Sequence, residues 1–328
     1  MGMCCSFPVD VEKRIGMRHG LSVTDRNYKG HKGKINSVAI SSDNTFIISG
    51  SSDKTIRIWD VESAECIKIL EGHTSRVQSI ALSKNNQFVV SGSFDKTVRL
   101  WDRVTGESIK TFCGHSYFVT SVDISPNNKY IVSSGLKDKT ARIWDVETGA
   151  CVQVLDIGRE VISVCFSNDN RFVLSGDEWY FRLWEVETGH NTREIRGGSS
   201  AKVALSSNGK YILTARGNTV SLLDVETFKT IKEFEGHTTY VESIGLSDND
   251  QWIVSGAGFA DDFVRLWNVA TGKQTRLKKV GNFSQDIDSV VFSADNKYIV
   301  SGASGWGICL WNVESITSKH VDTANPLQ

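Results

Sequence analysis

The sequence has few of the features that mark a membrane, secreted or nucleic-acid-binding protein. It contains no apolar run of about 18 residues, the length that a helix needs to cross a bilayer. Residues 1–30 lack the apolar stretch of a secretory signal peptide. Lys and Arg number 37 against 38 Asp and Glu, so no basic excess is available to neutralise phosphates. Nucleic acid is therefore not an expected partner.

Cysteine and proline are also scarce, and site motifs are missing. The seven Cys are an odd number without metal or disulfide spacing, which is typical of reduced thiols in a cytoplasmic protein. Three Pro and no low-complexity stretch leave little room for a disordered linker. The sequence has neither a phosphate-binding P-loop nor the GxSxG of a hydrolase, and no cluster with the spacing of a metal site. We predict no cofactor, no metal and no catalytic residue.

An internal repeat of about 40 residues runs through the chain instead. Its anchor residues are Trp59, Trp101, Trp144, Trp184, Leu223, Trp267 and Trp311. An apolar run ending in Ser or Thr, such as FIISG, precedes each anchor, and an alternating run such as INSVAIS comes earlier. Alternation with a period of two residues predicts strands, and turns such as SSDN and SPNN separate them. A further strand, such as CIKIL, follows the anchor.

Four short strands repeated seven times predict an all-β protein, a seven-bladed β-propeller of four-stranded antiparallel blades. Separate domains would leave each four-stranded sheet with an uncovered apolar face. We predict the propeller over residues 21–322, after an N-terminal arm at 1–20 and before a tail at 323–328.

The repeats resemble the WD-repeat family, whose signature is Gly-His near the start of a repeat and Trp-Asp near its end. The matching pairs are Gly30-His31, Gly72-His73, Gly114-His115, Gly236-His237, Trp59-Asp60, Trp101-Asp102 and Trp144-Asp145. The resemblance covers about residues 22–315. Either residues 21–29 or residues 316–321 could supply the fourth strand of the last blade. The resemblance favours 21–29, because the family usually closes its ring with the N-terminal segment.

The resemblance also implies a hydrogen-bonded tetrad in four of the blades, running from Trp through Ser and His to Asp. Indole N–H only donates, hydroxyl and imidazole pass the bond on, and carboxylate accepts. The tetrads would be Trp59, Ser49, His31 and Asp53; Trp101, Ser91, His73 and Asp95; Trp144, Ser134, His115 and Asp138; and Trp267, Ser255, His237 and Asp261. Ser, His and Asp also make hydrolase triads, but a nucleophile is needed once and this set occurs four times.

Blades four, five and seven depart from the pattern. Blade four has lost the His, blade five has Leu223 for Trp, and blade seven has Gly305 for Asp. We expect these blades to depend on apolar packing, with residues 150–225 the least stable part of the ring.

The loops that carry Gly-His and the turns before the third strands should lie at one end of the ring, which in this family is usually the partner-binding end. They are rich in aromatic residues and Arg, the types enriched at interface hot spots. The predicted partner-binding residues are Arg76, Phe94, Tyr117, Phe118, Trp179, Tyr180, Tyr240, Phe259 and Trp306. Polar residues further along the first strands should line the central channel: Asn36, Gln78, Thr120, Glu242 and Asp288.

These patterns favour a monomeric, non-enzymatic scaffold that binds protein or peptide partners. One alternative is a substrate-recruiting subunit of a larger complex, in protein ubiquitination or RNA processing. Another is an enzyme with its site at the channel mouth.

The first residues, MGMCCS, carry a separate signal. Gly2 with Ser6 fits the N-myristoylation pattern, and Cys4 and Cys5 could be palmitoylated as the second anchor that stable membrane attachment needs. The competing interpretation is an unstructured arm with two ordinary thiols. The first interpretation predicts a cytoplasmic protein tethered to a membrane surface.

Overall fold

The structure is a computed structural model that describes residues 28–197, 202–258, 261, 263–278, 286–304 and 307–318. The strands of the first four blades are β1 (Ile35–Ile40), β2 (Phe46–Ser51), β3 (Ile56–Asp60), β4 (Cys66–Leu70), β5 (Val77–Leu82), β6 (Phe88–Ser93), β7 (Thr97–Asp102), β8 (Ser108–Cys113), β9 (Val119–Ile124), β10 (Tyr130–Gly135), β11 (Thr140–Asp145), β12 (Cys151–Asp156), β13 (Val161–Phe166), β14 (Phe172–Asp177), β15 (Tyr180–Glu185) and β16 (Asn191–Arg196). The remaining elements are β17 (Lys202–Leu205), β18 (Tyr211–Arg216), β19 (Thr219–Asp224), β20 (Thr230–Phe234), β21 (Val241–Leu246), β22 (Trp252–Ala257), β23 (Phe263–Asn268), β24 (Gln274–Lys278), β25 (Ile287–Phe292), β26 (Tyr298–Ala303), β27 (Ile308–Asn312) and the helix α2 (Val313–Ser318).

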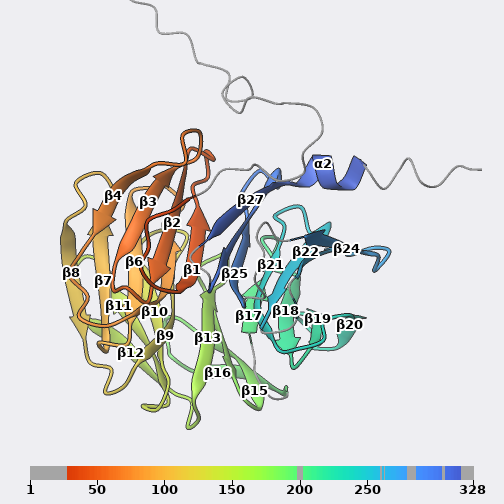
Figure 1. Cartoon of the computed structure of the whole chain (residues 1–328). Coiled ribbons are helices and arrows are strands. Elements are labelled where there is room, and N and C mark those ends of the chain that lie inside the picture. The colour runs from red at the N-terminus through yellow and green to blue at the C-terminus, as the bar shows by residue number, and fades with distance from the viewer. Residues whose placement is uncertain are drawn as a thin grey trace, which may run out of the picture.

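These strands form seven antiparallel sheets arranged around a central axis (Figure 1). In each sheet the strands follow one another in chain order. Six sheets have four strands, and the described part of the seventh consists of β25, β26 and β27. The predicted all-β, seven-bladed propeller is confirmed.

The turn between the first two strands of each blade explains the recurring Asn and Asp. One residue of each turn has a positive φ, between 55° and 71°, which Asn, Asp and Gly adopt most readily. These residues are Asn44, Asn86, Asn128, Asn170, Gly209, Asp250 and Asn296. In the first turn the N–H of Asn44 donates to the carbonyl of Ser41 at 3.0 Å, and the Ser41 hydroxyl accepts the N–H of Phe46 at 3.1 Å.

The Gly that follows Ser in runs such as FIISG is needed because the next blade packs directly on it. A Cβ on Gly50 would lie 2.9 Å from side-chain carbons of Val77 and Ile80, and a Cβ on Gly92 would lie 2.5 Å from Val119. Side chains of the first strand of the next blade therefore lie directly against the backbone of the second strand. Apolar clusters fill the rest of the space between the blades.

A series of Ser hydroxyls joins the innermost strands of neighbouring blades. Each accepts a backbone N–H of the following blade at 2.9–3.2 Å. The pairs are Ser37 with Ile80, Ser79 with Val122, Ser121 with Val164, Ser243 with Val290 and Ser289 with Val38. The last pair links blade seven to blade one and shows that the ring is closed (Figure 1).

The two candidates for the last strand of blade seven have different outcomes. The C-terminal candidate, residues 316–321, is wrong as a strand where it is described, because α2 runs through Val313–Ser318. Residues 21–27 of the N-terminal candidate lie outside the described residues. Tyr28 is buried, with its ring 6.2 Å from that of Trp59, in a cluster with Ile308 and Leu310 of β27. The N-terminal strand stays a prediction, as do the arm at 1–20 and the tail at 323–328.

Candidate functional site

The tetrad of blade one shows how a tetrad holds the loops of its blade. Trp59 Nε1–H donates to Ser49 Oγ at 2.7 Å, and Ser49 Oγ lies 2.8 Å from His31 Nε2. His31 Nδ1 lies 2.8 Å from Asp53 Oδ2. Because an ionised carboxylate only accepts, Nδ1 carries the proton, and Nε2 accepts the hydroxyl proton of Ser49. Each link of this tetrad therefore pairs one donor with one acceptor.

Blades two and six contain the tetrads that the sequence predicts, with the same geometry. Their Trp-to-Ser, Ser-to-His and His-to-Asp distances all lie between 2.7 and 2.8 Å. The residues are Trp101, Ser91, His73 and Asp95, and Trp267, Ser255, His237 and Asp261.

The prediction for blade three is wrong in one residue. Trp144 Nε1–H donates to Ser133 Oγ at 2.7 Å, and His115 Nε2 lies 2.7 Å from the same hydroxyl. Asp138 takes the predicted place, 2.6 Å from His115. Ser134 Oγ instead lies 2.9 Å from Thr120 Oγ1, because neighbouring side chains of a strand point to opposite faces.

Hydrogen bonds keep the tetrad carboxylates ionised. Burial alone would raise the pKa of Asp53, but hydrogen bonds from His31 and Thr55 outweigh it and hold that pKa well below its ordinary value. The pKa values of Asp95, Asp138 and Asp261 are lowered in the same way. Because the Ser and His side chains are buried, no substrate reaches them, and the tetrads are structural.

Blade four compensates for its missing His with an ion pair that the sequence analysis missed. Asp177 is buried, accepts the N–H groups of Trp179 and Tyr180 at 2.7 and 2.8 Å, and pairs with Arg182 Nη1. Arg182 Nε also donates to Glu194 at 2.6 Å. The expectation that this blade depends on apolar packing is therefore corrected.

The missed signal is an Arg two residues before the Trp of five blades. These residues are Arg57, Arg99, Arg142, Arg182 and Arg265, and each pairs across the sheet with the Ser that bonds its blade's Trp. In blade six Arg265 is buried and donates to Asp261 at 3.1 Å, so it supports the tetrad of that blade.

The surface formed by the Gly-His loops and the turns between second and third strands is called here the GH face. Backbone hydrogen bonds tie each loop to the turn of its own blade. The N–H of Phe94 donates to the Arg76 carbonyl at 3.0 Å, and that of Leu136 to the Phe118 carbonyl at 3.0 Å. In blade six the N–H of Gly258 donates to the Tyr240 carbonyl at 2.9 Å. The side chains predicted to bind partners therefore start from a fixed backbone.

Five side chains of blades two and three form a continuous stack on this face, called here the aromatic row. The Arg76 guanidinium carbon lies 3.5 Å from the ring centre of Phe94, which stacks on Phe118 at 4.1 Å and 14°. Tyr117 follows, 4.2 Å from Phe118, and Lys137 Nζ lies 5.3 Å from the Tyr117 ring.

The remaining predicted partner residues lie apart from the row. Trp179 is 43% exposed, with the Arg196 guanidinium 5.9 Å from its ring, and Tyr180 lies under Arg159 and Arg182. Tyr240 is 61% exposed in blade six. The other two predicted residues, Phe259 and Trp306, lie outside the described residues.

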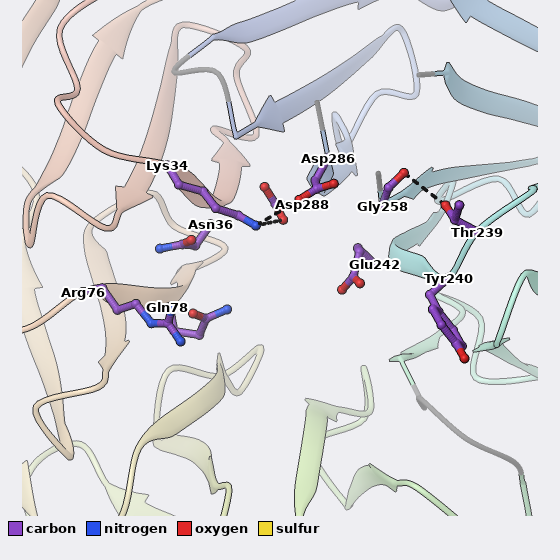
Figure 2. Close-up of a pocket in the computed structure, with 10 residues that line it drawn as sticks. All are labelled: Lys34, Asn36, Arg76, Gln78, Thr239, Tyr240, Glu242, Gly258, Asp286 and Asp288. Carbon is purple, nitrogen blue, oxygen red and sulfur yellow. Dashed lines mark hydrogen bonds and ion pairs between the residues drawn. The ribbon is translucent and has the colours of Figure 1, made fainter. Parts of the chain in front are cut away.

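The channel opens on the GH face through a polar pocket of about 500 Å³ (Figure 2). Lys34 and Arg76 lie on one side, Glu242 lies opposite, and Lys34 Nζ reaches Asp288 at 2.7 Å and Asp286 at 3.6 Å. Burial raises the pKa of Asp288 despite the neighbouring Lys34.

Deeper in the channel, the predicted lining residues Asn36, Gln78, Thr120, Glu242 and Asp288 surround a smaller space with Lys202. Burial lowers the pKa of Lys202. Within the described ranges, no group of His, Cys, Asp or Glu side chains is arranged to hold a metal ion.

Two family descriptions match the chain. The WD domain, G-beta repeat family matches residues 106–145, 149–185, 228–268 and 275–312. The first β-propeller of WD repeat-containing protein 75 matches residues 38–114. Together they cover more than half of the chain, and the propeller and its tetrads agree with them.

The chain belongs to the WD-repeat family.

Several curated WD-repeat proteins and regulators are similar to this chain. Human WD repeat-containing protein 18 is 42% identical over 141 residues, which are 42% of this chain and 32% of the relative. Autophagy-related protein 16 of Arabidopsis thaliana is 27% identical over 188 residues, 55% of this chain and 36% of the relative. Transcriptional corepressor LEUNIG_HOMOLOG, also of Arabidopsis thaliana, is 26% identical over 154 residues, 47% of this chain and 18% of the relative. The chain thus spans little more than a third of these relatives at most.

WD-repeat propellers generally act as scaffolds without enzymatic activity, and they typically bind other proteins. The buried tetrads of this chain agree with that role. Within the described residues, no helix has the length and apolar composition to cross a membrane.

Proposed function

We propose that this WD-repeat protein is a non-enzymatic scaffold that binds protein partners through the GH face. The observation that carries the proposal is the exposure of large aromatic side chains, above all Trp179 and Tyr240, on loops whose backbone is hydrogen-bonded to a rigid frame. Trp and Tyr bury a large area at low entropic cost and are enriched at binding hot spots. The inaccessible Ser and His side chains support a role without chemistry.

The test compares proteins that co-purify with variants of the full chain. Trp179→Ala and Tyr240→Ala, combined, remove the two large aromatic rings that are exposed on the described part of the GH face. Ile109→Ala and Ile231→Ala, combined, are the matched control, because these side chains are 47% and 53% exposed on the outer strands β8 and β20. We expect partners to be lost from the first variant and kept by the control, with unchanged melting temperatures. Identical partner sets for wild type and both variants would refute the proposal.

A second candidate function is recruitment of substrates to a larger complex. It is favoured by the names of other relatives, which include transcription initiation factor TFIID subunit 5 of Caenorhabditis elegans and the U3 small nucleolar RNA-associated protein 21 homolog of Schizosaccharomyces pombe. Native size-exclusion chromatography of cell extract separates the two. Elution of the whole population within one large assembly favours recruitment, and a free pool favours the scaffold.

We also propose that the scaffold is cytoplasmic and tethered to a membrane surface by acylation of Gly2, Cys4 or Cys5. The support is the sequence pattern alone, because residues 1–27 lie outside the described residues. Gly2→Ala should move the protein from the membrane to the soluble fraction, because it removes the myristoylation site and stable attachment needs two anchors. A wild-type protein found wholly in the soluble fraction contradicts the tether.

A further inference from the structure

The exposed side-chain charges on the loops around the aromatic row are mostly positive. The loops of blades two and three on the GH face are residues 71–76, 94–96, 114–118 and 136–139. Their cations are Arg76, Lys96, Lys137 and Lys139. Their carboxylates are the exposed Glu71 together with Asp95 and Asp138, which accept hydrogen bonds from a tetrad His and from backbone N–H groups. These loops therefore carry four cations and three carboxylates, an excess of one positive charge in a chain whose net charge is −1.

The cations at the two ends of the row lack a carboxylate partner. Among the described residues, neither Arg76 nor Lys137 forms an ion pair, whereas Lys34 of blade one pairs with Asp288. Arg76 and Lys137 are exposed, and each lies over an aromatic ring that fixes its position. Both charges are thus held at the surface and open to a ligand.

The geometry of the rings decides which anionic ligand fits. Arg76 covers one face of Phe94, Phe118 covers the other, and Tyr117 packs against Phe118. Because Phe94 and Phe118 stack inside the row, it leaves few ring faces on which a nucleobase could stack. The row offers ring edges, which carry partial positive charge and attract carboxylates. Cations at both ends and ring edges between them complement Asp and Glu side chains.

We propose that the aromatic row binds an acidic segment of a partner protein, with its carboxylates at Arg76 and Lys137. This inference rests on the proposed function of the GH face and names the chemistry of the partner. The carboxylates of the channel mouth, Glu242, Asp286 and Asp288, lie in blades six and seven, so the acidic segment lies over blades two and three.

The experiment uses fluorescence anisotropy with the full chain and three labelled probes. The first is a short peptide of repeated Glu-Asp-Leu units, the second carries Gln and Asn in place of Glu and Asp, and the third is oligouridine of the same length. We expect the acidic peptide to bind, its affinity to fall as salt rises, and the amide peptide not to bind. Oligouridine that binds more tightly than the acidic peptide would overturn the proposal in favour of single-stranded nucleic acid.

Two charge-reversal variants locate the site. Arg76→Glu with Lys137→Glu should raise the dissociation constant of the acidic peptide at least about tenfold, as loss of close charge pairs at an interface does. Lys129→Glu with Lys210→Glu makes the same change in net charge in exposed turns at the opposite face, and should leave the constant within about twofold. Equal weakening by both variants would show unspecific attraction and overturn the site. If the first variant does not fold, Arg76→Gln with Lys137→Gln replaces it.

The outcomes separate this inference from the proposed function. Suppose the acidic peptide does not bind, but co-purifying partners still depend on Trp179 and Tyr240. The acidic-segment inference then fails, and the scaffold proposal stands. If no partner depends on the GH face, the scaffold proposal fails whatever the peptide does.

Discussion

Replacing the two adjacent serines of β10 one at a time tests the tetrad assignment directly. Ser133 Oγ accepts the Trp144 Nε1–H and bonds His115 Nε2, both at 2.7 Å, and all three side chains are buried. Ser134 Oγ bonds Thr120 Oγ1 at 2.9 Å. The two substitutions, Ser133→Ala and Ser134→Ala, remove the same atom one residue apart in sequence.

The structure predicts very different costs. Ser133→Ala leaves an indole donor and an imidazole acceptor buried without partners, and each orphaned group costs about 1–3 kcal/mol, so the free energy of unfolding should fall by about 2–5 kcal/mol. Ser134→Ala removes one neutral hydrogen bond, and Thr120 Oγ1 keeps its bond to the Val161 carbonyl at 2.8 Å. Its cost should be about 0.5–1.5 kcal/mol.

The assay is urea unfolding followed by far-UV circular dichroism, with Ser91→Ala as the matched substitution in the tetrad of blade two. Ser91→Ala and Ser133→Ala should shift the midpoint by similar amounts. Hydrogen exchange measured by mass spectrometry should show faster exchange in β10 and β11 for Ser133→Ala alone. A loss of stability from Ser134→Ala that equals or exceeds that from Ser133→Ala would refute the reasoning.

Three further substitutions test other parts of the frame by the same unfolding assay. Trp101→Ala should cost about 3–5 kcal/mol, because the ring is almost fully buried, and a cost under about 1 kcal/mol would contradict its place in the core. Arg182→Met should cost about 3–5 kcal/mol by leaving Asp177 buried and unpaired, and adding Asp177→Asn should recover part of that loss; a neutral single variant would argue against the ion pair. Burial raises the pKa of Asp123 from its ordinary value of 3.8 to about 6. Between these two pH values the folded state holds a proton that the unfolded state has lost, so the free energy of unfolding falls as the pH rises from 3.8 towards 6. Asp123→Asn keeps an oxygen for the Phe166 N–H but loses the acceptor of the Ile124 N–H, so relative to its effect below the ordinary pKa it should stabilise the protein at pH 7 by up to about 3 kcal/mol. An equal effect at both pH values would exclude titration as the cause.

Periodic features of the fold could be predicted from the sequence because the same residue pattern recurs in each repeat. Alternation in runs such as INSVAIS indicated strands, and the Asn and Asp turns are the residues that adopt a positive φ. The tetrads of blades one, two and six followed from residue type and order. In blade three two serines, Ser133 and Ser134, precede Gly135, and the prediction named Ser134. Counting forward from His115 would have selected Ser133, because the separation of His and Ser is 18 residues in all four blades.

Other features depend on contacts that a repeat pattern does not contain. Arg182 was missed because the predicted pattern was built around His. In blade four, which lacks that His, Arg182 forms an ion pair with Asp177. The aromatic row joins Phe94 of one blade to Phe118 of the next, and only the packing of blade on blade brings their rings to 4.1 Å. The sequence could place these side chains on one face of the ring. It could not show that the aromatic rings pack against one another.

The tetrads and the aromatic row are parts of one mechanical arrangement. Asp95 accepts the N–H of Thr74 at 3.0 Å, and Asp138 accepts that of Ser116 at 3.2 Å, in the two loops that lead to the row. Each relay therefore begins at a Trp in the core and ends by fixing the backbone of a binding loop. Blade five, by contrast, has Leu223 for the anchor Trp, and no described Ser hydroxyl joins its inner strand to blades four or six. A surface that binds by preplaced charges loses affinity when its loops move. The row therefore lies in two blades that have both a tetrad and Ser bonds to their neighbours, and these bonds hold the loops on which its charges are placed.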